Sequence, residues 1–238
     1  MTDSHNHTLR AMYDRLWSAY GPQHWWPTDT GKAGLRTPAR RGLQVDAPTE
    51  VVIGAILTQN TAWINVERAI ANLKQAAALD FKVLRDLPES ELAELIRPSG
   101  TFRLKARRLK AFVDRLWDLH DGSLESLLAG EIETARRRLL DIPGIGPETA
   151  DAILLYAGDR PTFVVDAYTM RVLRRHFIVT DADDYESVRA NFHDALPREA
   201  ALFNEYHALF VEVGKRHCRV RARCDGCPLA DLPHDEGL

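Results

Sequence analysis

The three cysteines of this 238-residue chain all lie close to its C-terminus, in the stretch HCRVRARCDGCPLADLPH. Cys218, Cys224 and Cys227 follow a C-x5-C-x2-C spacing. A secreted disulfide scaffold would spread an even number of cysteines along the chain, whereas this clustering indicates a metal site. Three Cys and one His form a reasonable zinc set, and His234 follows shortly after Cys227. The weaker candidates for a fourth ligand are Asp231, Asp235 and His217.

A second candidate site is the stretch LLDIPGIGPETADAIL, residues 139–154. Pro143-Gly144 breaks one helical pattern, Gly146 permits a backbone conformation that a side chain would obstruct, and Pro147 suits the first position of a new helix. The pattern predicts a helix-hairpin-helix over about residues 139–151. Backbone N–H groups of the hairpin would point outward together and could bind a phosphate without reading a base. An ordinary helix–helix connection would give the same pattern.

Basic residues gather beside these motifs, although the net charge of the chain is −3. Such clusters can be solvated helix faces. Because they lie next to turn motifs, we interpret them jointly as a phosphate-binding surface. The four groups are Arg97, Arg103, Lys105, Arg107, Arg108 and Lys110; Arg136, Arg137 and Arg138; Arg171, Arg174 and Arg175; and Lys215 to Arg223.

The elements that must position these residues are almost all helical. The short β-like run PTFVV, residues 161–165, predicts an extended approach to Asp166, which can then cap the next helix. We therefore expect an all-α fold. Residues 28–48 lack periodicity and predict a long loop. The helical patterns cover Leu9 to Tyr20, Val51 to Leu57, Ile64 to Leu73, Glu89 to Ile96, Phe102 to Leu119, Ile132 to Leu140, Glu148 to Tyr156, Ala167 to Phe177, Asp184 to Ala195 and Glu199 to Arg216.

The bulk composition is that of an ordinary globular chain, with 45% hydrophobic and 27% charged residues. No apolar run approaches the roughly 18 residues that a membrane helix needs. The polar N-terminus carries no secretory signal pattern, so we expect a cytoplasmic protein with no membrane partner.

Four stretches together resemble the endonuclease III superfamily of DNA glycosylases. DIPGIGPETADAIL resembles the family's helix-hairpin-helix, and PTFVVDAYTMRV places Asp166 where the family has an extended approach to an aspartate. GAILTQNTAW resembles the helix end that presents a gap-filling Gln, here Gln59. IRPSGTFRLKARRL resembles the second wedge loop, with Thr101 and Phe102 at its tip. The resemblance spans about residues 10–230.

This resemblance implies a base-flipping enzyme that binds double-stranded DNA with a damaged base. Gln59, Thr101 and Phe102 would fill the gap that the extruded base leaves. Asp166 would stabilise the oxocarbenium-like sugar electrostatically and orient the attacking water. The residues implied in phosphate binding are Gly144, Ile145, Gly146, Glu148 and Thr149.

The hairpin departs from the bifunctional members of the family, which carry a lysine in the pattern PGxGxKTA. Here the stretch reads PGIGPETA, with Glu148 at that position. A carboxylate cannot form the Schiff base on which strand cleavage depends. We therefore expect a monofunctional glycosylase that uses water. Glu148 is otherwise an acid that stabilises the first turn of a helix.

The stretch WWP narrows the resemblance to the 3-methyladenine DNA glycosylases of endonuclease III type. In that branch these tryptophans and an aromatic after LTQNT enclose the alkylated base, which matches Trp25, Trp26, Pro27 and Trp63 here. Indole faces attract a cationic alkylated purine by about 0.5–2 kcal/mol. The tryptophans could instead be core residues. The rival functions are a glycosylase for mismatched or oxidised bases and a non-catalytic DNA-binding module.

The resemblance also bears on the cysteines and the lobes. Many relatives hold a [4Fe-4S] cluster with C-x6-C-x2-C-x5-C, but here Pro233 stands where the fourth cysteine would be. We favour [4Fe-4S] on Cys218, Cys224, Cys227 and His234 over structural zinc or an empty site. We expect a monomer of two helical lobes, 46–160 with the hairpin and 1–27 plus 161–238 with Asp166 and the cluster loop 218–234, joined by loop 28–45 and flanking the base pocket.

Overall fold

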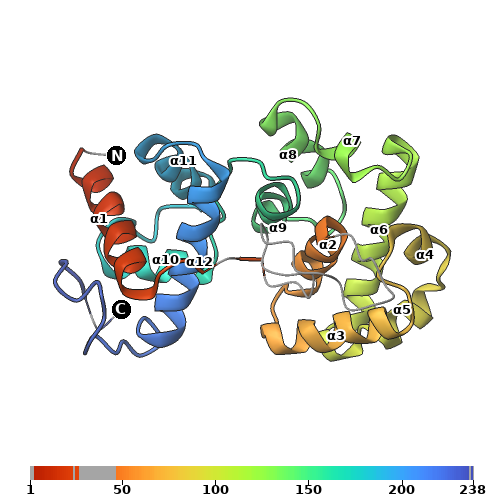
Figure 1. Ribbon diagram of the computed structural model, residues 1–238, viewed down its shortest axis with the longest axis horizontal. Helices are drawn as coiled ribbons and strands as arrows, with labels where there is room; N and C mark the ends of the chain where they lie inside the picture. Colours follow the sequence, from red (N-terminus) through yellow and green to blue (C-terminus); the bar gives the residue numbers. More distant parts are fainter. Residues whose placement is uncertain (1–2, 24, 27–46, 236, 238) are drawn as a thin grey trace. The chain divides into compact units, whose positions relative to one another are not determined.

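The computed structural model describes residues 3–23, 25–26, 47–235 and 237 (Figure 1). Pro27 and the expected connecting loop 28–45 lie outside these residues. The chain divides into two compact units, residues 1–25 with 159–238 and residues 26–158. Regular structure in the described ranges is helical, apart from an isolated β-bridge between Cys218 and Ala222, so the predicted all-α fold is confirmed. No described helix is both long and apolar enough to cross a membrane.

The unit of residues 26–158 is built around one buried helix. In α2 every residue from Thr49 to Leu57 is buried, as expected for a helix that is apolar on all sides. Amphipathic α3 and α6 pack against it. The elements are α2 (Ala47–Leu57), α3 (Trp63–Gln75), α4 (Phe81–Asp86), α5 (Glu89–Leu95), η1 (Arg97–Ser99), α6 (Phe102–His120), α7 (Leu124–Leu128), α8 (Ile132–Leu140), α9 (Pro147–Ala152) and the π-helix η2 (Ile153–Ala157).

The other unit has an aromatic core around an extended segment. The predicted PTFVV segment is extended, and its Phe163 stacks on Phe192 with ring centroids 3.6 Å apart. Tyr206 closes the core and donates its hydroxyl to the carbonyl of Leu9 at 2.7 Å. The helices of this unit are α1 (Asp3–Tyr20), α10 (Ala167–Arg175), α11 (Tyr185–Ala195) and α12 (Ala200–Arg216).

Two short helices escape the periodicity because they are too short to show an apolar stripe. Asp80 caps α4 by accepting the N–H groups of Lys82 and Val83, and Ser123 caps α7. These Asp and Ser residues are the signals that could have identified both helices. The predicted helix over 148–156 divides into α9 and the π-helix η2.

The structure corrects the interpretation of the basic groups as one phosphate-binding surface. Lys105, Arg136 and Arg175 are buried. The ammonium of Lys105 donates to the carbonyls of Leu57 and Ser99 at 2.8 and 2.5 Å. The carbonyls at the ends of short helices need donors, and these cations supply them. In the same way Lys110 donates to the carbonyls of Leu84, Arg85 and Leu87, and Arg138 to those of Leu127 and Ala129.

A buried ion pair joins the two helices of the predicted hairpin. Arg136 of α8 donates from Nε and Nη2 to both oxygens of Asp151 of α9, with distances of 3.0–3.1 Å. The side chains are 7% and 0% exposed. Removing one partner would leave a buried charge uncompensated.

We therefore predict that Arg136→Met lowers the free energy of unfolding by about 3–5 kcal/mol, as is usual when one partner of a buried pair is lost. Urea unfolding followed by circular dichroism measures the change. Arg137→Met, at the exposed neighbouring position, is the matched control and should have little effect. An equally small effect of Arg136→Met would show that the pair does not hold α8 to α9.

Lys105 predicts a pH dependence of stability. Burial, with the nearby charge of Arg108, lowers the pKa of Lys105 from 10.5 to about 8. Above that pH the folded chain has released this proton while the unfolded chain still binds it, so the contribution of Lys105 to the free energy of unfolding rises with pH. Lys105→Met should remove this rise between pH 8 and 10.5, whereas Lys82→Met, at an exposed position, should keep it. Identical slopes in urea titrations of both variants would contradict the assignment.

Candidate functional site

The hairpin between α8 and α9 is fixed by its glycine and its isoleucines. Gly144 has φ of +90°, and a Cβ there would lie 2.3 Å from Cγ of Arg108, so only glycine fits. Ile142 and Ile145 are buried beneath the turn. The N–H of Ile145 donates to the carbonyl of Ile142 at 3.0 Å, which corrects the expectation that this N–H points outward. Pro147 begins α9, as predicted, and Glu148 is exposed in its first turn.

Gln59, the predicted gap-filling residue, is held on this hairpin. Its amide Nε2 donates to the carbonyl of Gly144 at 3.0 Å and to Oγ1 of Thr149 at 2.9 Å. Its Oε1 accepts from Nη1 of Arg108. Three predicted DNA-contacting motifs of this unit, the GAILTQNT helix end, the hairpin and the basic helix α6, therefore meet at one amide group.

The second predicted wedge, Thr101 and Phe102, forms a strained tip. Thr101 has φ of 37° and ψ of 35°, in the left-handed region that a threonine rarely adopts, and its side chain is exposed. The guanidinium groups of Arg97 and Arg103 lie 5.7 and 5.8 Å from the centre of the Phe102 ring. Such strain persists only where the surroundings impose it, and it is common at functional positions. The ammonium of Lys105 donates to the carbonyl of Ser99, shortly before this tip, and to the carbonyl of Leu57, shortly before Gln59.

Asp166 lies in the other unit, at the start of α10. Its Oδ1 accepts the N–H of Thr169 at 2.7 Å, so the predicted capping role is confirmed. Its Oδ2 lies 3.6 Å from Nε2 of His207 on α12, and its side chain is 13% exposed. Burial by itself would raise the pKa of Asp166, but the nearby His207, with the bond from Thr169, brings that pKa below its usual value. Asp166 is therefore a largely buried carboxylate with a lowered pKa.

The predicted base-pocket tryptophans differ in their surroundings. Trp25 is half-buried, with its ring edge-on to His207 at 5.9 Å. Trp26 belongs to the other unit and is 4% exposed, with its indole packed over Gly54, where a Cβ would lie 3.3 Å from the ring. The centre of its ring lies 5.2 Å from that of Trp63 and 5.1 Å from that of Tyr156. Sequence reasoning missed Tyr156, although it directly precedes the AGD turn that ends η2.

The cysteines line one small cavity. The residues that line this cavity include the three cysteines and three histidines, His176, His217 and His234. Arg175 donates to Sγ of Cys218 at 3.2 Å, and Arg171 donates to the carbonyl of Cys218 at 2.6 Å. Burial raises the pKa of the Cys227 thiol. In the ranges that the structure covers, no three His, Cys, Asp or Glu side chains are close enough together to hold one metal ion.

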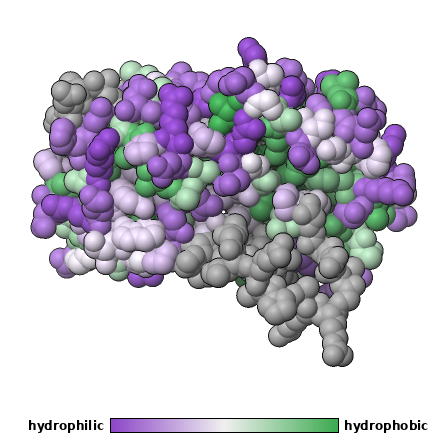
Figure 2. Space-filling view, turned by 45° about the horizontal axis from the view of Figure 1, so that its top comes forward, coloured by the Kyte–Doolittle hydropathy of each residue, from purple (hydrophilic) through white to green (hydrophobic). Residues whose placement is uncertain are grey.

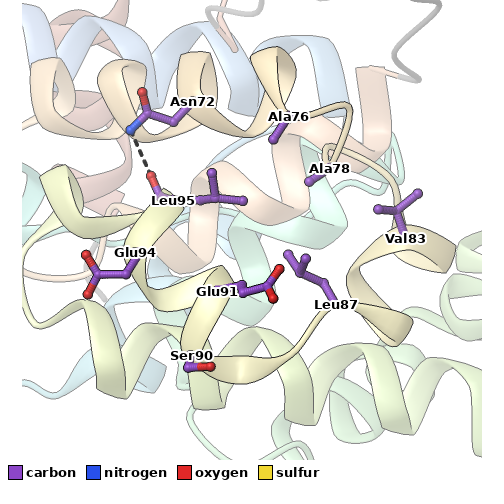
Figure 3. A pocket seen from close by; sticks show the side chains of 9 residues that line it. All are labelled: Asn72, Ala76, Ala78, Val83, Leu87, Ser90, Glu91, Glu94 and Leu95. Carbon is purple, nitrogen blue, oxygen red and sulfur yellow. Dashed lines mark hydrogen bonds between the residues drawn. The ribbon is translucent and has the colours of Figure 1, made fainter.

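A wide hollow among the described residues lies away from all these motifs. Figure 3 shows this cavity of about 700 Å³ between α3, α4 and α5, with Leu87 and Leu95 on its walls and Glu91 at its edge. It contains none of the predicted site residues. On the face drawn in Figure 2, hydrophobic residues are interspersed with hydrophilic ones. The exposed basic side chains left for a phosphate surface are Arg97, Arg103, Arg107, Arg137, Lys215, Arg216, Arg219, Arg221 and Arg223.

Comparison with known proteins places the chain in a family. Residues 53–198, more than half of the chain, match the HhH-GPD superfamily base excision DNA repair protein. A protein of Methanocaldococcus jannaschii, provisionally named a DNA repair glycosylase, is 42% identical over 223 residues, 93% of each chain. Endonuclease III of Thermotoga maritima is 28% identical over 181 residues, 76% of this chain and 79% of the relative.

A solved structure agrees with this assignment. The 3-methyladenine DNA glycosylase MagIII of H. pylori, bound to 1,N6-ethenoadenine, is 27% identical with a TM-score of 0.70, over 89% of this chain and 97% of that one. The chain therefore belongs to the HhH-GPD superfamily of base excision DNA repair proteins and is a helix-hairpin-helix DNA glycosylase of the endonuclease III superfamily.

Proposed function

We propose that this glycosylase is monofunctional and releases alkylated purines of the 3-methyladenine type from double-stranded DNA, leaving an abasic site. The observation that carries the proposal is the largely buried Asp166, whose carboxylate has a lowered pKa and one oxygen that accepts a hydrogen bond at the start of α10. The similarity to the H. pylori enzyme, whose name specifies 3-methyladenine, supports the substrate class.

Asp166 would act on the sugar of the damaged nucleotide. The bond from C1′ to the base nitrogen breaks, and its electron pair leaves with the base. Positive charge then builds on the sugar, where a preorganised carboxylate stabilises it most strongly. Water adds to C1′, and its proton passes to Asp166 or to solvent. An alkylated purine already carries positive charge and leaves easily, so one carboxylate is a sufficient catalyst.

No described residue of the hairpin supplies the amine that strand cleavage needs. Glu148 stands where bifunctional relatives have their lysine, and it is exposed at the first turn of α9. Lys105, the buried lysine nearest in sequence to the wedge, commits its ammonium to two carbonyls. Both features support hydrolysis by water over Schiff-base chemistry.

The aromatic residues would read the positive charge of the base. Trp25 and Trp63 are half-buried and keep part of their surface accessible, and both are indoles that attract a cationic ring. Trp26 packs against Gly54, Trp63 and Tyr156, and we assign it to the base pocket. The side chain of Gln59 is held on the hairpin by its bonds to Gly144 and Thr149. It would enter the DNA duplex, in the gap left by the extruded base, when the hairpin binds the DNA backbone.

For the C-terminal loop we propose a [4Fe-4S] cluster held by Cys218, Cys224, Cys227 and His234, with zinc as the alternative. The residue types support the proposal, because three cysteines and a histidine line the same cavity, although among the described residues no three of them lie close enough together to hold one metal ion. When bound, the cluster would be structural and would fix the loop that carries Arg219, Arg221 and Arg223.

We predict that the wild-type protein releases 3-methyladenine from alkylated duplex DNA and that Asp166→Asn slows single-turnover release at least 100-fold, within the range usual for loss of electrostatic stabilisation. Chromatography of the released bases measures this. Asp184→Asn is the matched control, because Asp184 caps α11 in the same way but is exposed. Unchanged release by Asp166→Asn would remove it from the mechanism.

A panel of duplexes with alkylated, mispaired and oxidised bases decides the substrate class. Release of thymine or an oxidised base without 3-methyladenine would favour the endonuclease III-like alternative, and binding without any release would favour the non-catalytic module. Borohydride should trap no enzyme–DNA adduct, and a trapped adduct would contradict hydrolysis by water.

The cluster gives a separate prediction. Protein purified without oxygen should show the visible absorption of an iron–sulfur protein and contain about four iron atoms per chain. His234→Ala should lower the iron content, whereas His193→Ala, at a position remote in sequence from the loop, should not. One zinc per chain and no visible absorption would replace the cluster with a structural zinc site.

A further inference from the structure

We propose that His207 is the positioning residue of the catalytic carboxylate, and that through α12 it holds Asp166 and Trp25 in one fixed arrangement. This inference rests on the proposed function in taking Asp166 as the catalyst. His207 is 5% exposed, and its Nε2 lies 3.6 Å from Oδ2 of Asp166. The same imidazole meets the ring of Trp25 at 5.9 Å with an interplanar angle of 75°. All three residues belong to one compact unit.

Asp166 is close to His207 because α10 approaches α12 at a glycine. A Cβ at Gly214 would lie 2.3 Å from Cδ1 of Tyr168, in the first turn of α10. Glycine inside a helix is destabilising relative to alanine, so its use here indicates a need for close packing. The packing brings the capped end of α10, with Asp166, against the face of α12 that carries His207.

Trp25 is attached to the same helix by several contacts. The backbone N–H of Gln23 donates to Oε2 of Glu205 at 2.6 Å, which fastens the segment before the tryptophan. The ammonium of Lys215 lies 5.5 Å from the centre of the Trp25 ring. His207 and Lys215 are about two turns apart on α12, so the indole is supported from two levels of one helix. A shift of α12 would therefore move the carboxylate and the indole together.

The other charges around His207 are engaged in their own contacts. Among the described residues, His207 is an ionisable group that lowers the pKa of Asp166. Thr169, an uncharged donor, lowers it too. The charged groups on the elements packed around His207 include Glu205 and Lys215 of α12, Arg171 of α10, which donates to the carbonyl of Cys218, and Arg10 of α1, which donates to that of Ala195. On the same helices Arg174 pairs with Asp181, Arg175 donates to Sγ of Cys218, and Glu212 pairs with Arg216. Loss of His207 would thus leave Thr169 to oppose the effect of burial on the pKa of Asp166.

The direct test is the titration of Asp166 in His207→Gln, which keeps a polar side chain of similar reach but carries no charge. NMR of protein labelled with 13C at aspartate carboxyls, with the signal assigned by Asp166→Asn, gives the midpoint. We expect the midpoint to move up by about one pH unit or more, as for loss of a favourable charged neighbour. His193→Gln is the matched control, because His193 lies in the same unit, stacked on Phe203. It should leave the midpoint unchanged.

The kinetic test is the pH profile of single-turnover release from alkylated duplex DNA. In His207→Gln the acid limb should move up in step with the titration, while release at pH 8 falls less than 10-fold. If His207→Gln does not fold, His207→Asn takes its place. An unmoved midpoint in a folded variant would overturn the inference. A wild type that releases no base would refute the proposed function, and the NMR midpoint would still decide the role of His207.

Discussion

Buried and half-buried cations that donate to backbone carbonyls are the interaction on which this fold depends. Several of its helices, such as α4, α5, α7 and α9, are short, so a large share of their carbonyls has no partner within the same helix. Lys105 serves the ends of α2 and η1, Lys110 that of α4 and Arg138 that of α7. In the other unit Arg175 binds the carbonyls of Arg219 and Val220. A neutral side chain at these positions would leave carbonyls unsatisfied, which is costly in a buried setting.

This constraint explains which expectations from the sequence were correct. The apolar periodicity located the long helices, because burial of one face sets that pattern directly. Charge is a weaker guide, since a lysine that binds DNA and a lysine that caps a helix are identical in sequence. Arg136 and Arg137 are adjacent, yet the first is paired with buried Asp151 and the second is exposed. Only the three-dimensional contacts distinguish the two residues. For this reason the predicted phosphate-binding surface included basic residues that are buried or bonded to carbonyls.

The candidate site shows the same division between what a motif predicts and what the contacts add. GIGPETA predicted the hairpin and its Pro147, because turn chemistry is local. The contact of Gln59 with Gly144 and Thr149 joins residues far apart in the chain, and no local pattern indicates it. In the same way Tyr156 is an ordinary apolar-helix residue by sequence, and its role becomes visible only where its ring meets Trp26. The cysteine spacing predicts ligands, while the identity of the group they bind depends on chemistry that spacing leaves open.

Asp166 and Asp184 make the point most sharply, because by sequence each is an aspartate that begins a helix. Each accepts the N–H three residues ahead, at 2.7 and 2.9 Å. Hydrogen bonds of this kind, from Ser187, lower the pKa of Asp184 in full exposure, where solvation already favours the charged form. Asp166 reaches a lowered pKa against the opposing effect of burial, and this requires His207. A carboxylate that is ionised and largely shielded from water, with one oxygen bonded to the N–H of Thr169 and the other 3.6 Å from His207, is preorganised to stabilise a cation, whereas an exposed cap reorients with solvent. The environment supplied by α12, more than the capping motif, therefore distinguishes the candidate catalyst from an ordinary helix cap.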